Sequence, residues 1–213
     1  MAKKGKVYAV KRGIKPGIYY SWEECKKNVI HFSGAVYKGF DSSTEAEAWL
    51  AQSGERKEIP TTVGEKEVLA YVDGSFKDKV PAYGYGVVLL TKHGKETKKG
   101  FGDNTKWMPL RNISGEILGV ITAVSWAIKN KYKKIDVVYD YSGLEHWAND
   151  EWKTNTTVTK QYRSFIHSSR KKIEIEFFKV KGHTGIQFNE EADKLAKEGI
   201  ELYLDKKNRD PNS

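Results

Sequence analysis

Two apolar runs in this chain each end in an aspartate, and this pairing constrains the fold more than any other feature. Asp73 closes the run 68–72 and is followed by Gly74, and Asp140 closes the run 135–139. Short apolar runs bounded by turn residues are typical of buried strands. If these strands are parallel neighbours, their exits lie level, and the sequence then places both carboxylates at one edge of a sheet.

Two further acidic residues lie on the apolar faces of expected helices. Glu116 stands four residues before Val120 and eleven before Ala127, which places it on a buried stripe. Asp193 stands one turn before Ala196 in a second helical pattern. A buried carboxylate needs a cation, a hydrogen-bond network or a proton, because an unpaired charge is costly to bury.

Taken singly, these residues have ordinary alternatives: a turn position for Asp73 and a half-exposed helical position for Asp193. Taken together, four carboxylates without a histidine–cysteine cluster favour oxygen-binding ions such as Mg²⁺ over zinc. Two such ions about 4 Å apart can hold the attacking and leaving oxygens of a phosphodiester. The set therefore predicts a metal-dependent phosphodiester chemistry.

Five short motifs, in this order, resemble the type 1 ribonuclease H family. The resemblance covers about residues 67–200, and its most distinctive parts are the glycine-flanked histidine and the Asn-Glu-x-x-Asp helix. The motifs are 71–75 (YVDGS), 112–116 (NISGE), 139–140 (YD), 180–185 (VKGHTG) and 189–193 (NEEAD).

This resemblance implies an endoribonuclease that hydrolyses the RNA strand of RNA–DNA hybrids, leaving 5′-phosphate and 3′-hydroxyl ends. The expected cofactor is a pair of Mg²⁺ ions, with Mn²⁺ as the alternative. Asp73 would bridge the ions and Asp193 would complete the ion that activates water, whereas Glu116 and Asp140 would hold the other ion. His183 is expected in proton transfer or product release.

The resemblance also implies contacts with both strands of the hybrid. Glu116, or backbone beside it, would sense the RNA 2′-hydroxyl, and Asn112 would read the minor groove. The chain has only the short acidic stretch 148–151 where many relatives carry a longer basic loop, and it has tyrosine after Asp140 where many have serine. Contacts with the DNA strand are expected from Arg111, Trp152, Thr154 and Asn155.

Composition favours a polyanionic partner. The 213 residues carry a formal net charge of +9 with a pI near 9.3, and aromatic residues make up 12%. A basic surface attracts nucleic acid, and aromatic rings stack on bases or pack on sugars. A single cysteine, Cys25, excludes an intrachain disulfide, and no stretch approaches the roughly 18 apolar residues of a membrane span. We expect a cytoplasmic monomer without an obligate protein partner.

The first 51 residues form a separate pattern of strand, strand, helix, strand and helix. The strands are expected at 6–11, 17–20 and 35–39, and the helices begin near Ser21 and Ser43. This segment has nine Lys or Arg against five Asp or Glu, a net of +4, so charge is concentrated here. Residues 52–66 are polar with two glycines and a proline, as expected of a linker.

Residues 5–50 are similar to the small N-terminal hybrid-binding domain found on many ribonucleases of this type. The resemblance implies that Tyr8 and Trp22 hold the DNA strand, because a ring packed on deoxyribose excludes a 2′-hydroxyl. The alternative is that both rings form the core of a small domain. Basic and aromatic residues of the same surface are expected to be Lys11, Tyr37 and Lys38.

The catalytic part, 67–200, is expected to form a ribonuclease H-like mixed five-stranded sheet with helices on both faces. The small α+β domain precedes it, and residues 201–213 form a C-terminal tail that is polar from Leu204 onward. Strands are predicted at 67–76, 84–91, 95–102, 135–140 and 173–179, and helices at 113–130, 143–149, 157–170 and 187–200.

Two other functions remain as alternatives. The chain could be a hybrid sensor with an inactive nuclease fold, although the presence of all four carboxylates argues against this. It could also be another polynucleotidyl transferase of the same fold, such as a resolvase or integrase. The histidine loop and the N-terminal domain favour hybrid hydrolysis.

Overall fold

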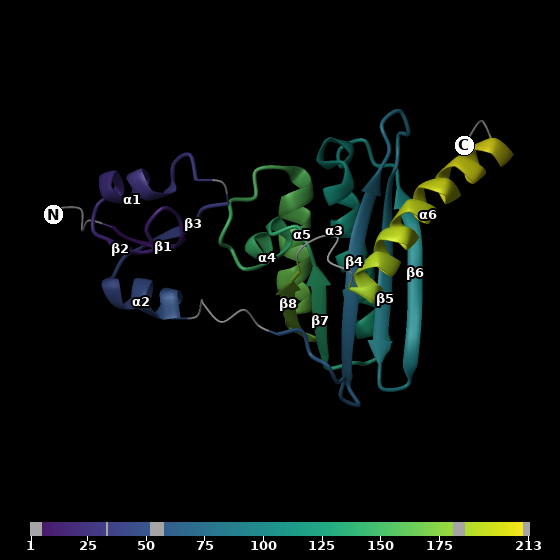
Figure 1. Ribbon diagram of the computed structural model, residues 1–213, viewed down its shortest axis with the longest axis horizontal. Coiled ribbons are helices and arrows are strands. Elements are labelled where there is room, and N and C mark those ends of the chain that lie inside the picture. The colour runs from purple at the N-terminus through teal and green to yellow at the C-terminus, as the bar shows by residue number, and fades with distance from the viewer. Residues whose placement is uncertain (1–5, 33, 52–57, 181–185, 211–213) are drawn as a thin grey trace. The chain divides into compact units, whose positions relative to one another are not determined.

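The chain divides into two compact units, Met1–Lys57 and Glu58–Ser213, and each has a sheet of its own (Figure 1). The computed structural model describes residues 6–32, 34–51, 58–180 and 186–210. Among these residues, no helix combines the length and the apolar character needed to cross a membrane.

The first unit is a three-stranded antiparallel sheet with two short helices. The strands pair in the order β2-β1-β3, and Ser21 caps α1 by accepting a hydrogen bond from the Glu24 backbone N–H at 3.2 Å. Small apolar clusters, one around Ala9 and Trp49 and one around Val10 and Cys25, form its core. The elements are β1 Val7–Arg12, β2 Gly17–Tyr19, α1 Trp22–Val29, β3 Val36–Phe40 and α2 Ser43–Ala51.

The second unit is a mixed five-stranded sheet in the order β6-β5-β4-β7-β8, which confirms the predicted fold class. The two pairs β4–β5 and β5–β6 are antiparallel, and the pairs β4–β7 and β7–β8 are parallel. The strands are β4 Glu67–Phe76, β5 Tyr83–Thr91, β6 Gly94–Gly102, β7 Lys134–Tyr139 and β8 Glu174–Lys179. The helices are the 3₁₀ turn η1 Met108–Leu110, α3 Asn112–Lys129, α4 Gly143–Ala148, α5 Thr157–Ser169 and α6 Gln187–Arg209.

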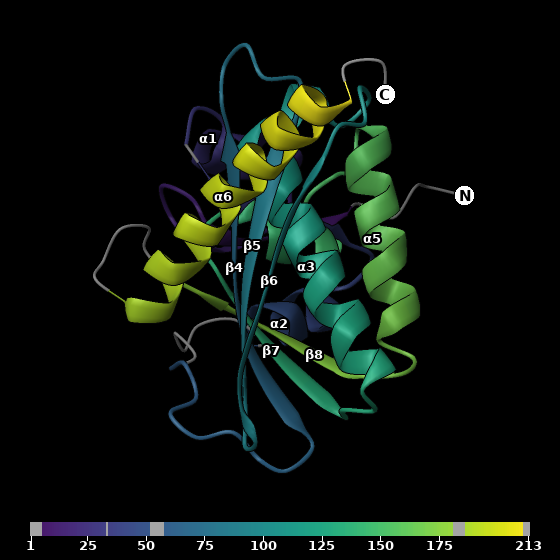
Figure 2. The same ribbon diagram turned by 90° about the vertical axis from the view of Figure 1, so that its right-hand side faces the viewer.

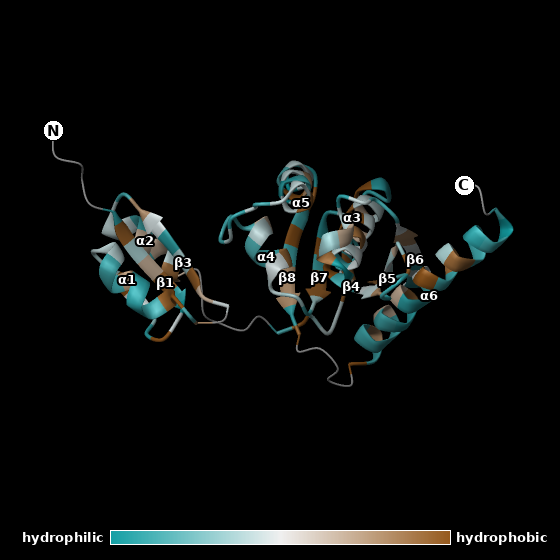
Figure 3. Cartoon of the chain, turned by 90° about the horizontal axis from the view of Figure 1, so that it is seen from above, coloured by the Kyte–Doolittle hydropathy of each residue, from teal (hydrophilic) through white to brown (hydrophobic). Residues whose placement is uncertain are grey.

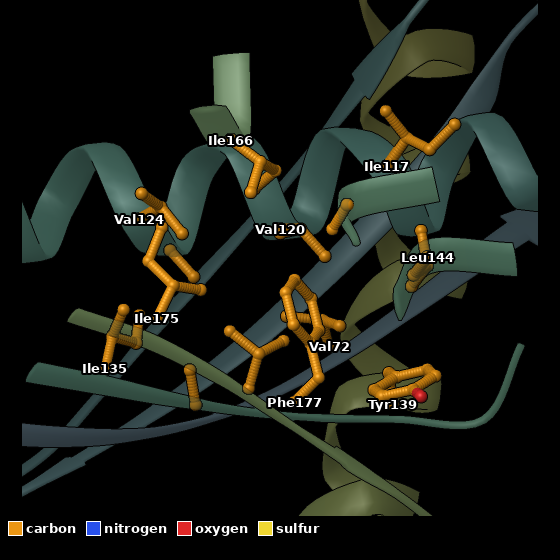
Figure 4. Close-up of a cluster of buried hydrophobic side chains, with 14 of the residues drawn as sticks. Val72, Ile117, Val120, Val124, Ile135, Tyr139, Leu144, Ile166, Ile175 and Phe177 are labelled. Carbon is orange, nitrogen blue, oxygen red and sulfur yellow. The ribbon is translucent and has the colours of Figure 1, made fainter. Parts of the chain in front are cut away.

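Helices cover both faces of this sheet because alternate strand residues point to opposite sides. On β4, Val72 packs with α3 and α5 in the larger core, and Tyr71 packs with α6 in the smaller one. Figure 2 shows α6 on one face and α3 and α5 on the other, and Figure 4 shows the larger core, with Val120 and Ile166 facing Phe177. In Figure 3 most of α6 has the colour of hydrophilic residues, whereas β7 and β8 carry hydrophobic residues.

The prediction that the last helix ends at residue 200 was wrong, because α6 continues to Arg209. Tyr203, predicted to lie in the C-terminal tail, is 6% exposed and its ring meets Phe101 of β6 edge-on at 5.3 Å. Glu201 also accepts a hydrogen bond from Lys77 at 2.5 Å. These contacts with the sheet stabilise two further helical turns that the polar sequence alone does not indicate.

Candidate active site

The parallel pairing of β4 and β7 brings Asp73 and Asp140 together. Tyr71 of β4 lies opposite Val138 of β7, so Asp73 and Asp140 each follow two residues further along their strands. Both carboxylates are half-buried. This confirms that the two strands are parallel neighbours and that the two carboxylates lie level. The expectation that the strand ends at Asp73 was wrong, because β4 continues to Phe76 and Asp73 pairs with Gly86 of β5 inside the strand.

Glycines allow α3 to bring Glu116 against the same part of β4. A Cβ atom added to Gly74 would stand 2.4 Å from the Glu116 backbone nitrogen, and one added to Gly115 would stand 2.0 Å from the Gly84 carbonyl oxygen. Backbone cannot yield to such contacts, so only glycine permits this approach of helix to sheet. Glu116 itself is 2% exposed.

Asp73, Glu116 and Asp140 form a tight group, here called the carboxylate cluster. One oxygen from each side chain lies within 4.8 Å of the others. Glu116 Oε2 is buried and has no hydrogen-bond partner among the described residues. Asp73 Oδ1 accepts a hydrogen bond from the Gly74 backbone N–H at 2.6 Å. The cluster is therefore an incompletely satisfied set of oxygens.

The electrostatics of the cluster disfavour three negative charges. Burial, reinforced by the charge of Asp140, raises the pKa of Asp73 to about 7. Burial, followed by Asp140 and Asp73, raises the pKa of Glu116 well above its usual value, and the Tyr141 backbone N–H only partly opposes this. An orphaned buried oxygen within an all-carboxylate set fits a hard divalent cation such as Mg²⁺.

Asp193 lies beside the carboxylate cluster but is not one of its three members. It stands on α6, which approaches β5 so closely that a Cβ on Gly86 would lie 2.0 Å from the Ala192 carbonyl oxygen. Its charge contributes to raising the pKa of Asp73, so the two carboxylates are near enough to interact. The structure thus brings three of the four predicted ligands within 4.8 Å of one another, and it places the fourth, Asp193, close enough to Asp73 for their charges to interact.

Lys197 is a residue of this site that the sequence reasoning missed. Its ammonium donates to Asp193 Oδ2 at 2.6 Å, and its charge lowers the pKa of Asp73. The signal was available, because an acid followed four residues later by a lysine on a helix is a typical ion pair.

His183 lies outside the described residues. Of the predicted hybrid contacts, Asn112 is the exposed first residue of α3, and its backbone carbonyl packs on Gly74. Arg111 precedes it with a positive φ of 54°, pairs with Asp78 at 2.7 Å and covers the Phe76 ring at 4.9 Å. The Arg111 side chain is therefore already engaged within the chain.

Trp152, Thr154 and Asn155 lie in the loop between α4 and α5. Trp152 is half-buried, and its ring stacks on His146 at 4.6 Å. Glu151 in turn contacts His146 Nδ1 at 2.5 Å. Thr154 is half-buried and Asn155 is exposed.

Asp150, in the same loop, pairs with Arg163 and His167 of α5. The acids of the short loop thus hold it against α4 and α5, a role that the sequence analysis did not identify.

The first unit carries a row of three aromatic rings at its surface, here called the aromatic row. Trp22 lies between Tyr8 and Tyr37, with ring centroids 5.5 and 5.7 Å apart. Trp22 and Tyr37 are each 37% exposed, so neither ring is a core residue, whereas Tyr8 is half-buried and packs against the cluster around Val10 and Cys25. The predicted cations lie elsewhere on aromatic faces, with the Lys11 ammonium 3.9 Å from the Trp49 ring centre and that of Lys38 5.8 Å from Phe40.

Two family models match the chain. One, described as RNase H, matches residues 65–201, and the other, described as the ribonuclease H1 N-terminal domain, matches residues 6–50. The ribonuclease H1 of Mus musculus is 25% identical over 264 residues, covering 94% of this chain and 91% of the mouse protein. The ribonuclease H of Clostridium botulinum is 29% identical over 155 residues, covering 65% of this chain and 98% of its own length.

Solved structures share the fold of the second unit. The RNase H1 of the archaeon Halobacterium salinarum has a TM-score of 0.51 at 22% identity, covering 63% of this chain and 98% of that one. LC11-RNase H1, solved in complex with an RNA/DNA hybrid, has a TM-score of 0.53 at 16% identity, covering 64% of this chain and 99% of that one.

Proposed function

Because this chain belongs to the type 1 ribonuclease H family, we propose that it hydrolyses the RNA strand of RNA–DNA hybrids at the carboxylate cluster. It is a ribonuclease H enzyme with an N-terminal hybrid-binding domain ahead of the catalytic one. The observation that carries the proposal is the group of three carboxylates within 4.8 Å, one of which presents a buried oxygen without a partner.

The site would hold two Mg²⁺ ions, or Mn²⁺ in their place. Asp73 would be shared between them, Glu116 and Asp140 would hold one, and Asp193 would complete the other. When bound, such ions stabilise charge on the attacking and leaving oxygens of a phosphodiester. Attack of water on phosphorus with loss of the 3′-oxygen leaves a 5′-phosphate on one product and a 3′-hydroxyl on the other.

The chain's own residues would prepare this site in three ways. The Gly74–Gly115 contact fixes Glu116 beside β4, and the Tyr141 backbone N–H helps to orient its carboxylate. Lys197 holds the Asp193 side chain and partly neutralises the site. We assign proton transfer or product release to His183.

Recognition of the hybrid would be divided between the two units. In the first, the aromatic row would pack on deoxyribose of the DNA strand. Lys11 and Lys38, whose ammonium groups lie over Trp49 and Phe40, would leave those rings to reach its phosphates. In the second, Glu116 and Asn112 would read the RNA side, and Arg111 and the 152–155 loop would contact DNA. A monomer without a protein partner would suffice for both tasks.

The direct test compares labelled RNA–DNA, RNA–RNA and DNA–DNA duplexes with and without Mg²⁺. We expect cutting of the RNA–DNA duplex alone, only with the ion, and product ends that carry 5′-phosphate. Binding of the hybrid without cutting under any divalent ion would instead favour a hybrid sensor. Cutting of branched or duplex DNA would favour a resolvase-like activity.

A second test addresses reading of the 2′-hydroxyl. A DNA duplex with an uninterrupted run of four ribonucleotides should be cut faster than one with a single ribonucleotide, because several riboses must be read around the cluster. Equal rates on both substrates would contradict the assignment of Asn112 and Glu116 to RNA recognition.

A further inference from the structure

The lysines of the second unit differ in whether an acid neutralises them. Along β6 and α6, lysines meet glutamates: Lys95 pairs with Glu191 at 2.8 Å and Lys99 with Glu198 at 2.7 Å. Lys98 likewise pairs with a glutamate of its own strand at 2.9 Å. This stripe of alternating sign is a satisfied surface with little capacity for an external anion.

A second group of lysines, here called the basic edge, has no such partners. All of its members are exposed, and no member's side chain makes an ion pair or hydrogen bond with another residue in the described part of the chain. The basic edge consists of Lys66, Lys129, Lys131, Lys133, Lys171 and Lys172.

Backbone hydrogen bonds bring the three segments of the basic edge together. The Lys133 N–H donates to the Lys66 carbonyl at 2.8 Å, and the Glu174 N–H donates to the Lys133 carbonyl at 2.9 Å. Figure 2 shows the ends of α3 and α5 lying beside each other where β7 and β8 begin. A shallow groove of about 440 Å³ lies there, with Lys133 and Lys172 in its wall.

The acids of this region cancel only part of the positive charge. Asp136 and Glu176 face Lys134, at 3.4 and 3.5 Å, and Glu67 stands opposite Lys134 on β4. Among the described residues, Glu174 is the only acid that lines the groove. Arg170 also lines the groove, but its guanidinium donates to the Ala148 carbonyl at 2.7 Å and to the Asn149 side chain at 2.6 Å. These acceptors are neutral, so Arg170 keeps its charge and adds to that of the lysines, although its guanidinium is held by them.

Helix dipoles explain only part of this arrangement. Lysines near helix C-termini are favourable, which accounts for Lys129 in the last turn of α3 and for Lys171 just after α5. Lys66 precedes a strand, and Lys131 and Lys133 lie beyond the helix, so the dipole effect has faded at these positions. Because these lysines lie together without acidic partners, they create a positive potential that attracts an external anion.

The basic edge is distinct from the carboxylate cluster. The cluster lies toward the carboxyl ends of β4 and β7, and the edge lies at their amino ends. Six residues of extended chain separate Lys134 from Asp140, or about 20 Å at about 3.3 Å per residue. A nucleic-acid segment on the edge is therefore a different segment from the one cut in the cluster.

We propose that the basic edge binds the phosphodiester backbone of a nucleic-acid segment outside the active site. Several unpaired ammonium groups on three neighbouring chain segments can each contact a phosphate, and their neutralisation would release counterions. On a long nucleic acid, this contact keeps the enzyme near its substrate by raising the effective concentration. The proposal does not depend on the assigned chemistry.

The test uses the full chain and a fluorescent DNA duplex of about 20 base pairs, which the proposed activity does not cut. The edge variant is Lys131→Gln/Lys133→Gln/Lys172→Gln, and the matched control is Lys95→Gln/Lys98→Gln/Lys99→Gln, which removes the same charge from the satisfied stripe. Fluorescence anisotropy at several salt concentrations gives affinity and its salt dependence. Thermal unfolding verifies that both variants fold.

We expect the edge variant to bind the duplex about tenfold more weakly, with the slope of log affinity against log salt reduced by roughly two to three units. The control should lose less than threefold. Equal losses of affinity in both variants would show that only the net charge of the protein matters, which would overturn the proposal. Undiminished DNA binding by the edge variant would also overturn it, as would a wild-type protein that does not bind the duplex. The same anisotropy measurement with fluorescent poly-glutamate tests for an acidic protein partner. If the edge variant lost poly-glutamate binding but kept DNA binding, the proposal would be overturned in favour of such a partner.

Discussion

The two units depart from the ordinary rule of burial in opposite directions. In the first, aromatic rings that would usually fill a core lie at the surface, with Trp22 and Tyr37 each 37% exposed. In the second, carboxylates that would usually face water are buried, with Glu116 2% exposed and the pKa of Asp73 raised to about 7. Each departure marks the surface or site where we propose that the unit acts.

The difference lies in what each departure requires. Exposed rings that already pack on one another cost little in the absence of a ligand, so the aromatic row can bind without a metal ion. Buried carboxylates repel one another until a cation or proton arrives, so the second unit depends on metal ions. Binding by the first unit and chemistry in the second should therefore be separable by mutation.

The largest separation is expected from Asp73→Asn. Asparagine keeps the size of the side chain but removes the charge from the centre of the cluster, so cleavage of a hybrid should fall by at least about a hundredfold. Binding of the hybrid should remain within a few-fold, because the aromatic row is intact. Cleavage rates at saturating hybrid and anisotropy without divalent ions measure the two quantities.

Asp205→Asn is the matched control, because Asp205 is an exposed acid of α6 outside the carboxylate cluster. It should cleave at the wild-type rate. Retention of more than about a tenth of wild-type turnover by Asp73→Asn would contradict the proposed ion-bridging role.

Deletion of residues 1–60 tests the converse separation, in which hybrid binding is weakened and cleavage chemistry is kept. This segment contains the aromatic row and much of the chain's excess positive charge, so we expect hybrid binding to weaken by tens-fold and its salt dependence to flatten by roughly one unit per lost phosphate contact. Turnover at saturating hybrid should stay within a few-fold. Equal affinity of the truncated and intact chains at about 0.15 M salt would refute the division of labour.

Trp22→Ala should weaken hybrid binding by about tenfold with little change in salt dependence, since a ring packed on a sugar releases no counterion. Tyr20→Ala is the control, because Tyr20 is 68% exposed and outside the aromatic row. Similar losses from both substitutions would indicate that general surface aromaticity, rather than this row, binds the hybrid.

Most of the fold was predictable because its strands and helices have strong periodic patterns. The apolar runs before Asp73 and Asp140 indicated parallel strands, and the stripe containing Glu116 indicated the helix that meets them. The last nine residues of the 23-residue helix α6 were not predictable, because their stability comes from Tyr203 and Glu201 contacting distant residues of the sheet and its turns. The local sequence of this segment does not indicate such long-range contacts.

The site shows the same division. Sequence placed three carboxylates that the structure brings into one cluster, because strands and helix faces follow from periodicity. The separation of Asp193 from this group and its pairing with Lys197 depend on how closely α6 approaches the sheet at Gly86. The loop acids Asp150 and Glu151 resemble a solvated turn in sequence, and only the fold pairs them with α5 and α4.

The smallest expected effect concerns stability without metal ions. A carboxyl whose pKa is about 7 when folded and 3.8 in its ordinary state binds its proton more tightly in the folded protein. Its contribution to stability is therefore complete below about pH 4 and is lost as pH rises through about 7. In chelator, the second unit should become less stable between these limits, and Mg²⁺ should reverse the loss at the alkaline end.

Asp73→Asn isolates this contribution. At pH 8 in chelator the variant should be more stable than the wild type by about 2 kcal/mol, because the buried charge is gone while the amide oxygen can still accept the Gly74 hydrogen bond. At pH 4 the two proteins should unfold alike, and with Mg²⁺ at pH 8 the order should reverse. Circular dichroism of thermal unfolding follows this, since most of the helix belongs to the second unit. A variant less stable than the wild type in chelator at pH 8 would show that Asp73 stabilises the fold without a cation. The contrast with the aromatic row, which needs no metal ion, would then fail.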